Sequence, residues 1–345
     1  GDTDDDGDGD IDSDDIPDIV VLTDDGGQQG NTHGVLRRIS GDGSGHVKSL
    51  QMEFFEESIQ IYPYRYSNAA LGDLDGDGVP EIVIMVAGIP GDLGDPGVPS
   101  DDPDTPVWPA PPPPYGEDPG GGSSEEVCIP AAFSAELELQ WLAGEVQVDC
   151  GGHAPALVDL EGDGSVELLL GPFIVEGATG ELRAQSDAGE GRHYAYEEIG
   201  MHTAASDLDL DGVAEILLGP TLVDPLGGTI CQADGLYDGY TAAADFTGDG
   251  MGEVVVVGNG LAGIYDHECQ VLVRWSLSGG GTGGPPTISD FDTDGQPEIG
   301  IAEAETYTVY EADGSVLWSA EVSDSSSHAT GSVVFDFEAD GRPEV

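Results

Sequence analysis

The sequence predicts an all-β fold of the β-propeller class, and three features support this prediction. One nine-residue acidic pattern occurs seven times in the 345 residues. Each complete copy leads into a short apolar run rich in β-branched residues, which is typical of buried strands. The last four intervals between copies are about 45 residues each, a period typical of propeller blades. We therefore expect repeated small sheets and no long helix.

The pattern has acids at positions 1, 3, 5 and 9 and usually glycine at position 6. Its copies are DIDSDDIPD from Asp10, DLDGDGVPE from Asp73, DLEGDGSVE from Asp159, DLDLDGVAE from Asp207, DFTGDGMGE from Asp245, DFDTDGQPE from Asp290 and DFEADGRPE from Asp336. The apolar runs that follow lie at 19–22, 82–85, 168–170, 216–218, 254–257 and 299–302. The segments ahead of several copies, such as SNAALG and YTAAA, are predicted strands of small residues. Each copy is therefore expected to be an acidic loop between two strands.

The spacing of the acids favours a calcium site in each loop. Ca²⁺ takes about six to eight oxygen ligands, and alternate positions turn three carboxylates toward one point, with the carbonyl at position 7 adding a ligand. Glycine at position 6 permits the positive φ that such a turn needs. Position 12, which is acidic in helix–loop–helix calcium sites, is apolar here, as at Ile84 and Leu170. The acid at position 9 is therefore expected to close the site.

The expected metal ligands are the side chains at positions 1, 3, 5 and 9. They are Asp10, Asp12, Asp14 and Asp18; Asp73, Asp75, Asp77 and Glu81; Asp159, Glu161, Asp163 and Glu167; Asp207, Asp209, Asp211 and Glu215; Asp245, Thr247, Asp249 and Glu253; Asp290, Asp292, Asp294 and Glu298; and Asp336, Glu338, Asp340 and Glu344. The neutral Thr247 and the longer Glu161 and Glu338 weaken their copies. Magnesium is less suited because it demands strict octahedral geometry. Solvated turns without metal are the alternative, which seven copies with a constant acid at position 9 disfavour.

Composition excludes several classes of protein. With 69 acidic and 8 basic residues, the formal charge is −61. Nucleic-acid binding needs Lys and Arg to neutralise phosphates, so it is not expected. No apolar run approaches the roughly 20 residues needed to span a bilayer. Hydrophobic residues still make up 38% of the chain, enough to bury a core if the charge is compensated.

Four cysteines, Cys128, Cys150, Cys231 and Cys269, form no C-x-x-C pair, which argues against tetrahedral zinc. We expect two disulfides, Cys128 with Cys150 at the exit of the proline-rich segment and Cys231 with Cys269 across one blade, and hence an oxidising, extracytoplasmic setting. Other pairings and four buried thiols stay open as alternatives.

Two segments stand apart from the repeats. Residues 88–127 contain eleven prolines and are expected to form a mobile insertion, with a partner-binding or glycan-bearing arm as the alternative. Residues 1–9 form an acidic lead-in whose Asp2, Asp4 and Asp6 either bind a further calcium or make a charged linker.

The pattern D-x-D-x-D-G-x-x-[DE] before an apolar strand resembles the FG-GAP or VCBS-type repeats of calcium-binding β-propellers, as in the head of integrin α chains. LLLGP at 168–172 and ILLGP at 216–220 are similar to the Gly-Ala-Pro ending of that family. The resemblance covers residues 10–345 apart from the insertion, and implies blades of four antiparallel strands with the calcium loop in the first hairpin. Seven blades with the last incomplete are expected. A six-bladed ring closed by the strand near 332–337 and a strand donated by a neighbouring molecule are alternatives.

The resemblance implies adhesion heads, lectin-like modules or polysaccharide lyases. We expect a surface or extracellular protein that acts in adhesion or assembly, with a protein, a glycan or copies of itself as partner, and not an enzyme. A calcium-dependent polysaccharide lyase would need a basic cleft, and Arg37, Arg38 and Lys48 are the only local concentration of basic residues. A lectin would show aromatic-lined pockets repeated from blade to blade.

Overall fold

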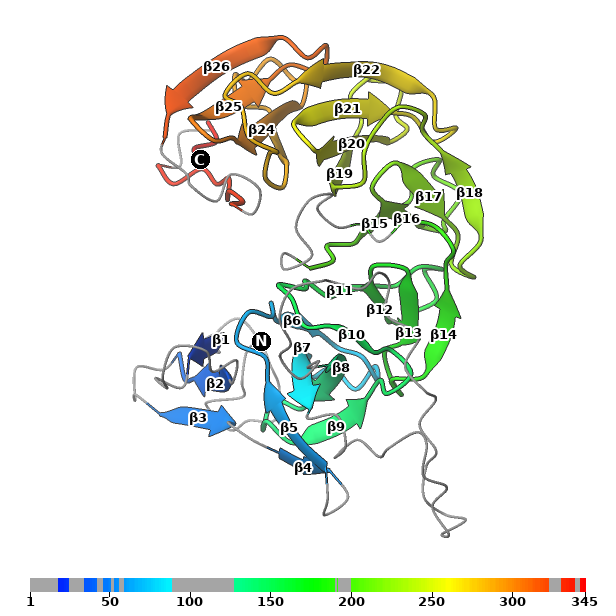
Figure 1. Ribbon diagram of the computed structural model, residues 1–345, viewed down its shortest axis with the longest axis vertical. Coiled ribbons are helices and arrows are strands. Elements are labelled where there is room, and N and C mark those ends of the chain that lie inside the picture. Colours follow the sequence, from blue (N-terminus) through cyan, green and yellow to red (C-terminus); the bar gives the residue numbers. More distant parts are fainter. Residues whose placement is uncertain are drawn as a thin grey trace, which may run out of the picture. The chain divides into compact units, whose positions relative to one another are not determined.

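A computed structural model describes residues 18–24, 34–41, 46–50, 53–55, 59–88, 127–189, 191, 200–322, 330–338 and 342–345. All regular elements within these ranges are β-strands, which confirms the all-β prediction (Figure 1). None of these residues lies in a helix long and apolar enough to cross a membrane. The chain splits into two compact units, Gly1–Leu157 with Val175–Leu182 and Val158–Ile174 with Arg183–Val345.

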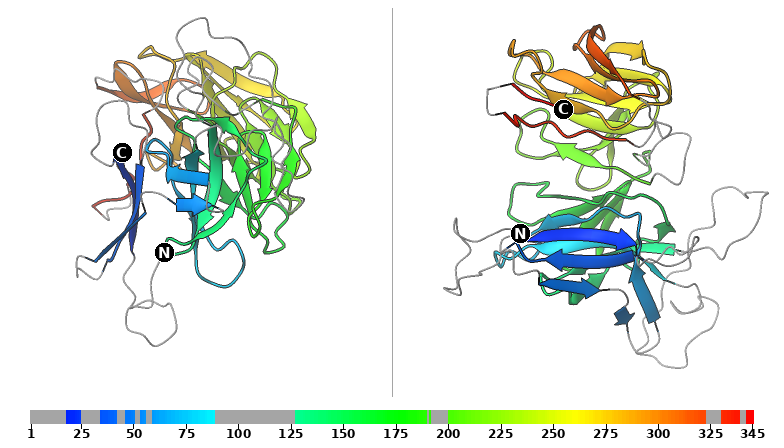
Figure 2. Two further views of the ribbon diagram at one scale, coloured as in Figure 1. Left: turned by 60° about the horizontal axis from the view of Figure 1, so that its bottom comes forward. Right: turned by 90° about the vertical axis from the view of Figure 1, so that its left-hand side faces the viewer.

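The described residues of the first unit form a three-stranded and a seven-stranded antiparallel sheet. Figure 2 shows this part of the chain in blue to green from two further sides. The three-stranded sheet has the order β1 (Ile19–Asp24), β2 (Gly34–Ile39) and β3 (Val47–Leu50). The larger sheet has the order β10-β8-β7-β5-β4, with β6 paired to β7 and β9 paired to β8. Its strands are β4 (Glu53–Phe55), β5 (Ile59–Pro63), β6 (Ala70–Gly72), β7 (Glu81–Gly88), β8 (Val127–Phe133), β9 (Leu139–Leu142) and β10 (Val148–Asp149). The path β6-β7-β8-β9 repeats the four-stranded order of the later sheets.

The predicted insertion joins two adjacent strands of this sheet. β7 pairs with β8 from Ile82 opposite Phe133 to Gly88 opposite Val127. Residues 89–126 and the lead-in 1–9 lie outside the described residues.

Four antiparallel sheets of four consecutive strands follow, as the resemblance implied. Their strands are β11 (Ala156–Val158), β12 (Glu167–Leu170), β13 (Phe173–Glu176) and β14 (Leu182–Gln185); β15 (Ala204–Ser206), β16 (Glu215–Leu218), β17 (Thr221–Val223) and β18 (Thr229–Gln232); β19 (Tyr240–Ala244), β20 (Glu253–Gly258), β21 (Leu261–Tyr265) and β22 (Val271–Ser276); and β23 (Thr287–Ser289), β24 (Glu298–Ala302), β25 (Thr306–Tyr310) and β26 (Val316–Glu321). In each sheet the acidic loop connects the first strand to the second. The predicted number of seven blades stays a prediction.

The second unit shows why the apolar runs are continuous instead of alternating. On β20, Val254 packs in a core with Leu217 of the preceding sheet, whereas Val255 packs in another core with Ile299 of the following sheet. Successive side chains of a strand point to opposite faces, so a strand between two sheets buries both faces. The first strands β15, β19 and β23 lie next to one another. The last strands β18, β22 and β26 lie on the far side of each sheet (Figure 1).

Successive sheets also contact each other at one repeated position. The last strand of a sheet touches a residue of positive φ in the turn between the third and fourth strands of the next sheet. These pairs are Trp141 with Gly180 (φ 74°), Ala184 with Gly227 (φ 81°), Cys231 with Cys269 (φ 60°) and Trp275 with Gly314 (φ 82°). A Cβ at Gly180 would lie 2.7 Å from the Trp141 indole, so glycine is required there.

Both expected disulfides are present. Cys128 is bonded to Cys150, 22 residues away, and Cys231 to Cys269, 38 residues away. The first bond lies within the large sheet of the first unit, where β8 pairs with β10. The second replaces the tryptophan–glycine contact with a covalent bond between two sheets.

Candidate metal centres

Five of the acidic loops, from the second copy to the sixth, share one set of backbone hydrogen bonds. In the loop from Asp290, the Asp294 amide donates to Asp290 Oδ1 at 2.9 Å and the Gly295 amide donates to Asp290 Oδ2 at 2.9 Å. The Gln296 amide donates to Asp294 Oδ1 at 2.8 Å. The same three bonds recur in the loops from Asp73, Asp159, Asp207 and Asp245. The carboxylate at position 1 therefore organises the turn whatever else it binds.

Two positions of each loop adopt positive φ, of which the sequence predicted one. Glycine at position 6 has φ between 91° and 94° in all five loops. Position 4 is also left-handed, and Leu210 (φ 60°) and Thr293 (φ 65°) occupy it in two copies. The other three copies have glycine at position 4, namely Gly76, Gly162 and Gly248. These glycines were the sequence signal from which the left-handed backbone at position 4 could have been predicted. A non-glycine residue in this region costs about 1 to 2 kcal/mol, which the loop hydrogen bonds must offset.

In the second to sixth copies, the acid at position 9 is the first residue of the strand that follows the loop. In the sixth copy, Glu298 is fully buried and its Oε2 accepts the Phe291 amide at 2.6 Å. The equivalent bond from the amide at position 2 is made to Glu81, Glu167, Glu215 and Glu253, at 2.7 to 3.0 Å. This bond occupies one carboxylate oxygen and directs the other into the loop.

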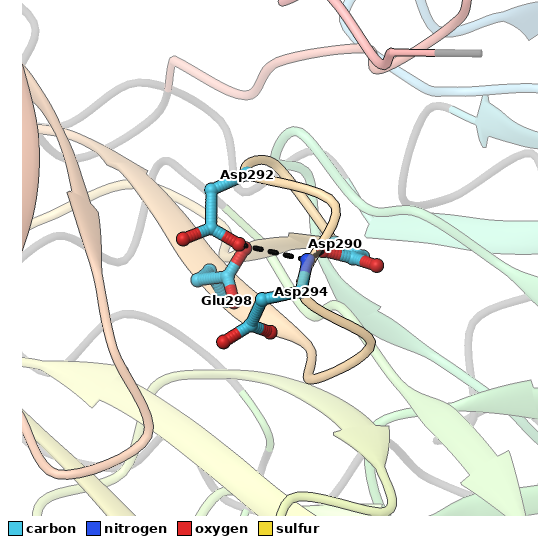
Figure 3. Close-up of side chains that lie close together, drawn as sticks. All are labelled: Asp290, Asp292, Asp294 and Glu298. Carbon is cyan, nitrogen blue, oxygen red and sulfur yellow. Dashed lines mark hydrogen bonds between the residues drawn. The ribbon is translucent and has the colours of Figure 1, made fainter.

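Of the five loops that the structure describes in full, four bring carboxylates together closely enough to hold one cation. Their ligand oxygens lie within 4.8 Å of one another in four groups: Asp290, Asp292, Asp294 and Glu298; Asp73, Asp75 and Glu81; Asp207, Asp209 and Glu215; and Asp245, Asp249 and Glu253. Figure 3 shows the first group gathered at its loop, with the Asp294 amide donating to Asp292 at 3.0 Å. Asp77 and Asp211, which were predicted as ligands, are not among the gathered residues. In the fifth copy, the Thr247 hydroxyl instead donates to Glu253 Oε1 at 3.2 Å.

The sixth loop offers the clearest fit to a cation. Glu298 Oε1 is buried and has no hydrogen-bond partner among the described residues. Burial, together with the charges of Asp292, Glu311 and Asp290, raises the pKa of Glu298 to about 7. A buried carboxylate oxygen without a donor is costly, and a hard cation held by oxygen ligands removes that cost. Burial is also the main cause that raises the pKa of Glu81 and of Glu215.

The third loop is different, although all its residues are described. It is not one of the four gathered groups. Arg183 of β14 reaches it instead: Nη1 lies 3.1 Å from Glu167 Oε1 and donates to Glu161 Oε2 at 3.1 Å, and Nη2 donates to Glu161 Oε1. A cationic side chain thus contacts two of the four predicted ligands, while Asp159 and Asp163 make the usual loop bonds. The sequence did not predict this role for Arg183.

The first and seventh copies are described only in part. Asp10, Asp12, Asp14 and Asp340 lie outside the described residues. Asp18 of the first copy forms an ion pair with Arg38 and accepts the Gly41 amide at 3.0 Å. In the seventh copy, Glu344 Oε2 accepts the Phe337 amide at 2.7 Å, the same bond as in the complete loops. The hydrogen bond from the amide at position 2 to the acid at position 9 is therefore also present in the seventh copy.

Comparison with known proteins agrees with the motif. Residues 10–84 match the family described as the FG-GAP-like repeat. Comparison with curated protein sequences finds no match. The fold is similar to the biofilm matrix protein Bap1 of V. cholerae, with 15% identity, a TM-score of 0.66 and coverage of 99% of this chain and 74% of that chain.

Two further solved structures are less similar. The rhamnogalacturonan lyase YesW has 14% identity and a TM-score of 0.44, over 86% of this chain and 67% of that chain. A lectin from Agrocybe aegerita that recognises non-reducing terminal N-acetylglucosamine has 15% identity and a TM-score of 0.33, over 85% and 88%. The match at residues 10–84 confirms the predicted resemblance to FG-GAP repeats, and the likeness to Bap1 concerns the fold.

Proposed function

We propose that this chain, which carries an FG-GAP-like repeat, is a calcium-stabilised β-propeller that acts outside the cell in adhesion or as a structural unit of a matrix. The observation that carries the proposal is the fully buried Glu298, whose Oε1 has no hydrogen-bond partner among the described residues and faces three further carboxylates. A cation bound in the sixth loop would pair with this oxygen and neutralise the gathered carboxylates. Calcium suits it because the donors are all oxygens and the loops differ in ligand number.

In this proposal, bound calcium makes the loop and its two flanking strands more rigid and takes no part in catalysis. Each loop joins the first two strands of a sheet, so a cation bound there ties the two strands together at one end. The carboxylates at positions 1 and 9 are already held by backbone amides, so little ordering is needed on binding. Asp290, Asp292, Asp294 and Glu298 would be the ligands in the sixth loop, and the gathered groups of the second, fourth and fifth loops would act in the same way.

The two disulfides support the extracellular setting, because such bonds persist in oxidising compartments. The adhesive or matrix role is supported by the similarity in fold to a biofilm matrix protein. A protein, a glycan or a second copy of the chain would be the partner.

The lyase alternative gains little from the only local group of basic residues. Arg38 and Lys48 both contact Glu136, and Arg38 also pairs with Asp18. Arg37 contacts the Thr23 and Ser49 hydroxyls instead. Because adjacent residues of a strand point to opposite faces, Arg37 and Arg38 do not present one basic surface to an acidic sugar.

The test is thermal unfolding with calcium and with EDTA, alongside native mass spectrometry. Calcium should raise the melting temperature of the wild type and add several ions per chain, whereas magnesium should do less. Glu298→Gln should bind one ion fewer, and Glu305→Gln, which changes an exposed carboxylate outside the loops, should bind the full number. An unchanged melting temperature in EDTA would refute the calcium proposal. A monomer at all concentrations, without binding to glycan or protein surfaces, would refute the adhesive role.

A further inference from the structure

The third loop carries four acids like its neighbours, but it has its own positive charge. Arg183 lies between Glu161 at position 3 and Glu167 at position 9, in contact with both. The Glu167 side chain is 1% exposed, and those of Arg183 and Glu161 are 20% and 29% exposed. The ion pairs are therefore largely shielded from water.

We propose that Arg183 is the built-in cation of this loop, so that residues 159–167 keep their conformation without a divalent metal. The inference rests on the proposed function, because it specifies which repeats take calcium. The conformation of the third loop would then not depend on a metal, whereas that of the second, fourth, fifth and sixth loops would.

The comparison between position-9 carboxylates carries the inference. Glu167 and Glu298 each use Oε2 to accept the amide at position 2. Their second oxygens differ: Glu298 Oε1 has no partner among the described residues, while Glu167 Oε1 lies 3.1 Å from Arg183 Nη1. The Arg183 guanidinium therefore pairs with Glu167 Oε1, the oxygen equivalent to the one that would bind a metal in the sixth loop. A metal in the third loop would be repelled by the positive charge of Arg183.

The residue at position 3 supports the same assignment. Position 3 of the third copy is Glu161; the seventh copy also has glutamate there, whereas the first, second, fourth and sixth copies have aspartate. The additional methylene of Glu161 places both carboxylate oxygens on the Arg183 guanidinium, with Nη1 on Oε2 and Nη2 on Oε1. Such a paired contact is the strongest geometry for an arginine and a carboxylate.

A related contact occurs in the other compact unit. Asp18, the position-9 acid of the first copy, forms an ion pair with Arg38 of β2, and the Asp18 side chain is 4% exposed. An arginine from a later strand of the same sheet thus reaches the position-9 acid in two separate repeats. The chain has only 8 basic residues, so two of them at this position are a substantial share.

The experiment is peptide-resolved hydrogen exchange of the full chain in calcium and in EDTA, with native mass spectrometry to count bound ions. In the wild type, EDTA should speed exchange at least tenfold in peptides that cover 73–81, 207–215, 245–253 and 290–298, and should leave 159–167 unchanged. Arg183→Ala should make exchange in 159–167 depend on calcium and add one ion per chain. Arg274→Ala, an arginine on β22 that contacts the Gly235 carbonyl, should change neither.

The outcomes separate this inference from the proposed function. If 159–167 in the wild type responds to EDTA like the other loops, Arg183 is not its cation and only this inference fails. A wild type in which no loop responds overturns the calcium proposal and the inference with it. If Arg183→Ala does not fold, the wild-type comparison still decides, because it needs no variant.

Discussion

The disulfide between Cys231 and Cys269 should be exchangeable for the tryptophan–glycine pair that occupies the same inter-sheet position elsewhere. Trp141 with Gly180 and Trp275 with Gly314 are the natural examples. Two double variants make the comparison: Cys231→Ala with Cys269→Ala removes the bond, and Cys231→Trp with Cys269→Gly replaces it by the contact found between other sheets.

The expected magnitudes follow from the loop length and the backbone. The bond closes a span of 38 residues, and the chain-entropy model assigns roughly 4 kcal/mol to it. Cys269 has a φ of 60°, so glycine at this position recovers about 1 kcal/mol. Burying part of an indole adds about 2 kcal/mol. The alanine variant should therefore lose about 4 kcal/mol and the tryptophan–glycine variant only about 1 kcal/mol.

Urea unfolding in calcium, followed by circular dichroism under non-reducing conditions, measures both losses. The matched control is the Cys128–Cys150 bond, which spans 22 residues and joins strands of one sheet. Its removal should cost roughly 3 kcal/mol, and Cys128→Trp with Cys150→Gly should not restore stability. If the tryptophan–glycine variant at 231 and 269 is no more stable than the alanine variant, the two positions are not equivalent and the reasoning fails.

Two further predictions concern single residues of the second unit. Gly314→Ala should destabilise the protein by about 2 kcal/mol and Gly280→Ala by about 1 kcal/mol. Both glycines have positive φ, but of the two only Gly314 would bring its new Cβ against an indole, 3.0 Å from Trp275. Equal losses of unfolding free energy in urea would contradict this. In EDTA, the raised pKa of Glu298 means that the fold favours its protonated form. The stability of the wild type relative to Glu298→Gln should therefore be highest below about pH 4.5 and fall as the pH rises through about 7; a difference independent of pH would refute it.

The local features of the fold were predictable because they depend on residues close together in sequence. Asp290 and Asp294 are four residues apart, and Glu298 follows at the start of the next strand, so one short segment determines the loop. The left-handed backbone at Thr293 escaped prediction because the glycine signal at position 4 is present in only three of the five complete loops. The two disulfide pairs were expected from the sequence with other pairings left open. The expected position of the Cys231–Cys269 bond across one blade was wrong, because Cys231 lies on β18 and Cys269 lies in the turn between β21 and β22 of the next sheet.

The sequence by itself determined the repeat and the strands on either side of the second to sixth loops, since these depend on local spacing and on the two-residue period of a strand. It did not determine which of the predicted ligands gather, because Asp77 and Asp211 lie outside the gathered groups. Only the tertiary structure decided which carboxylates have a partner. Glu167 and Glu298 occupy the same position of the same motif, yet Glu167 contacts Arg183, whereas Glu298 has a buried oxygen that receives no hydrogen bond from any residue the structure describes. That difference depends on whether a later strand of the same sheet carries an arginine within reach, and side chains distant in sequence come into contact only when the sheet is assembled.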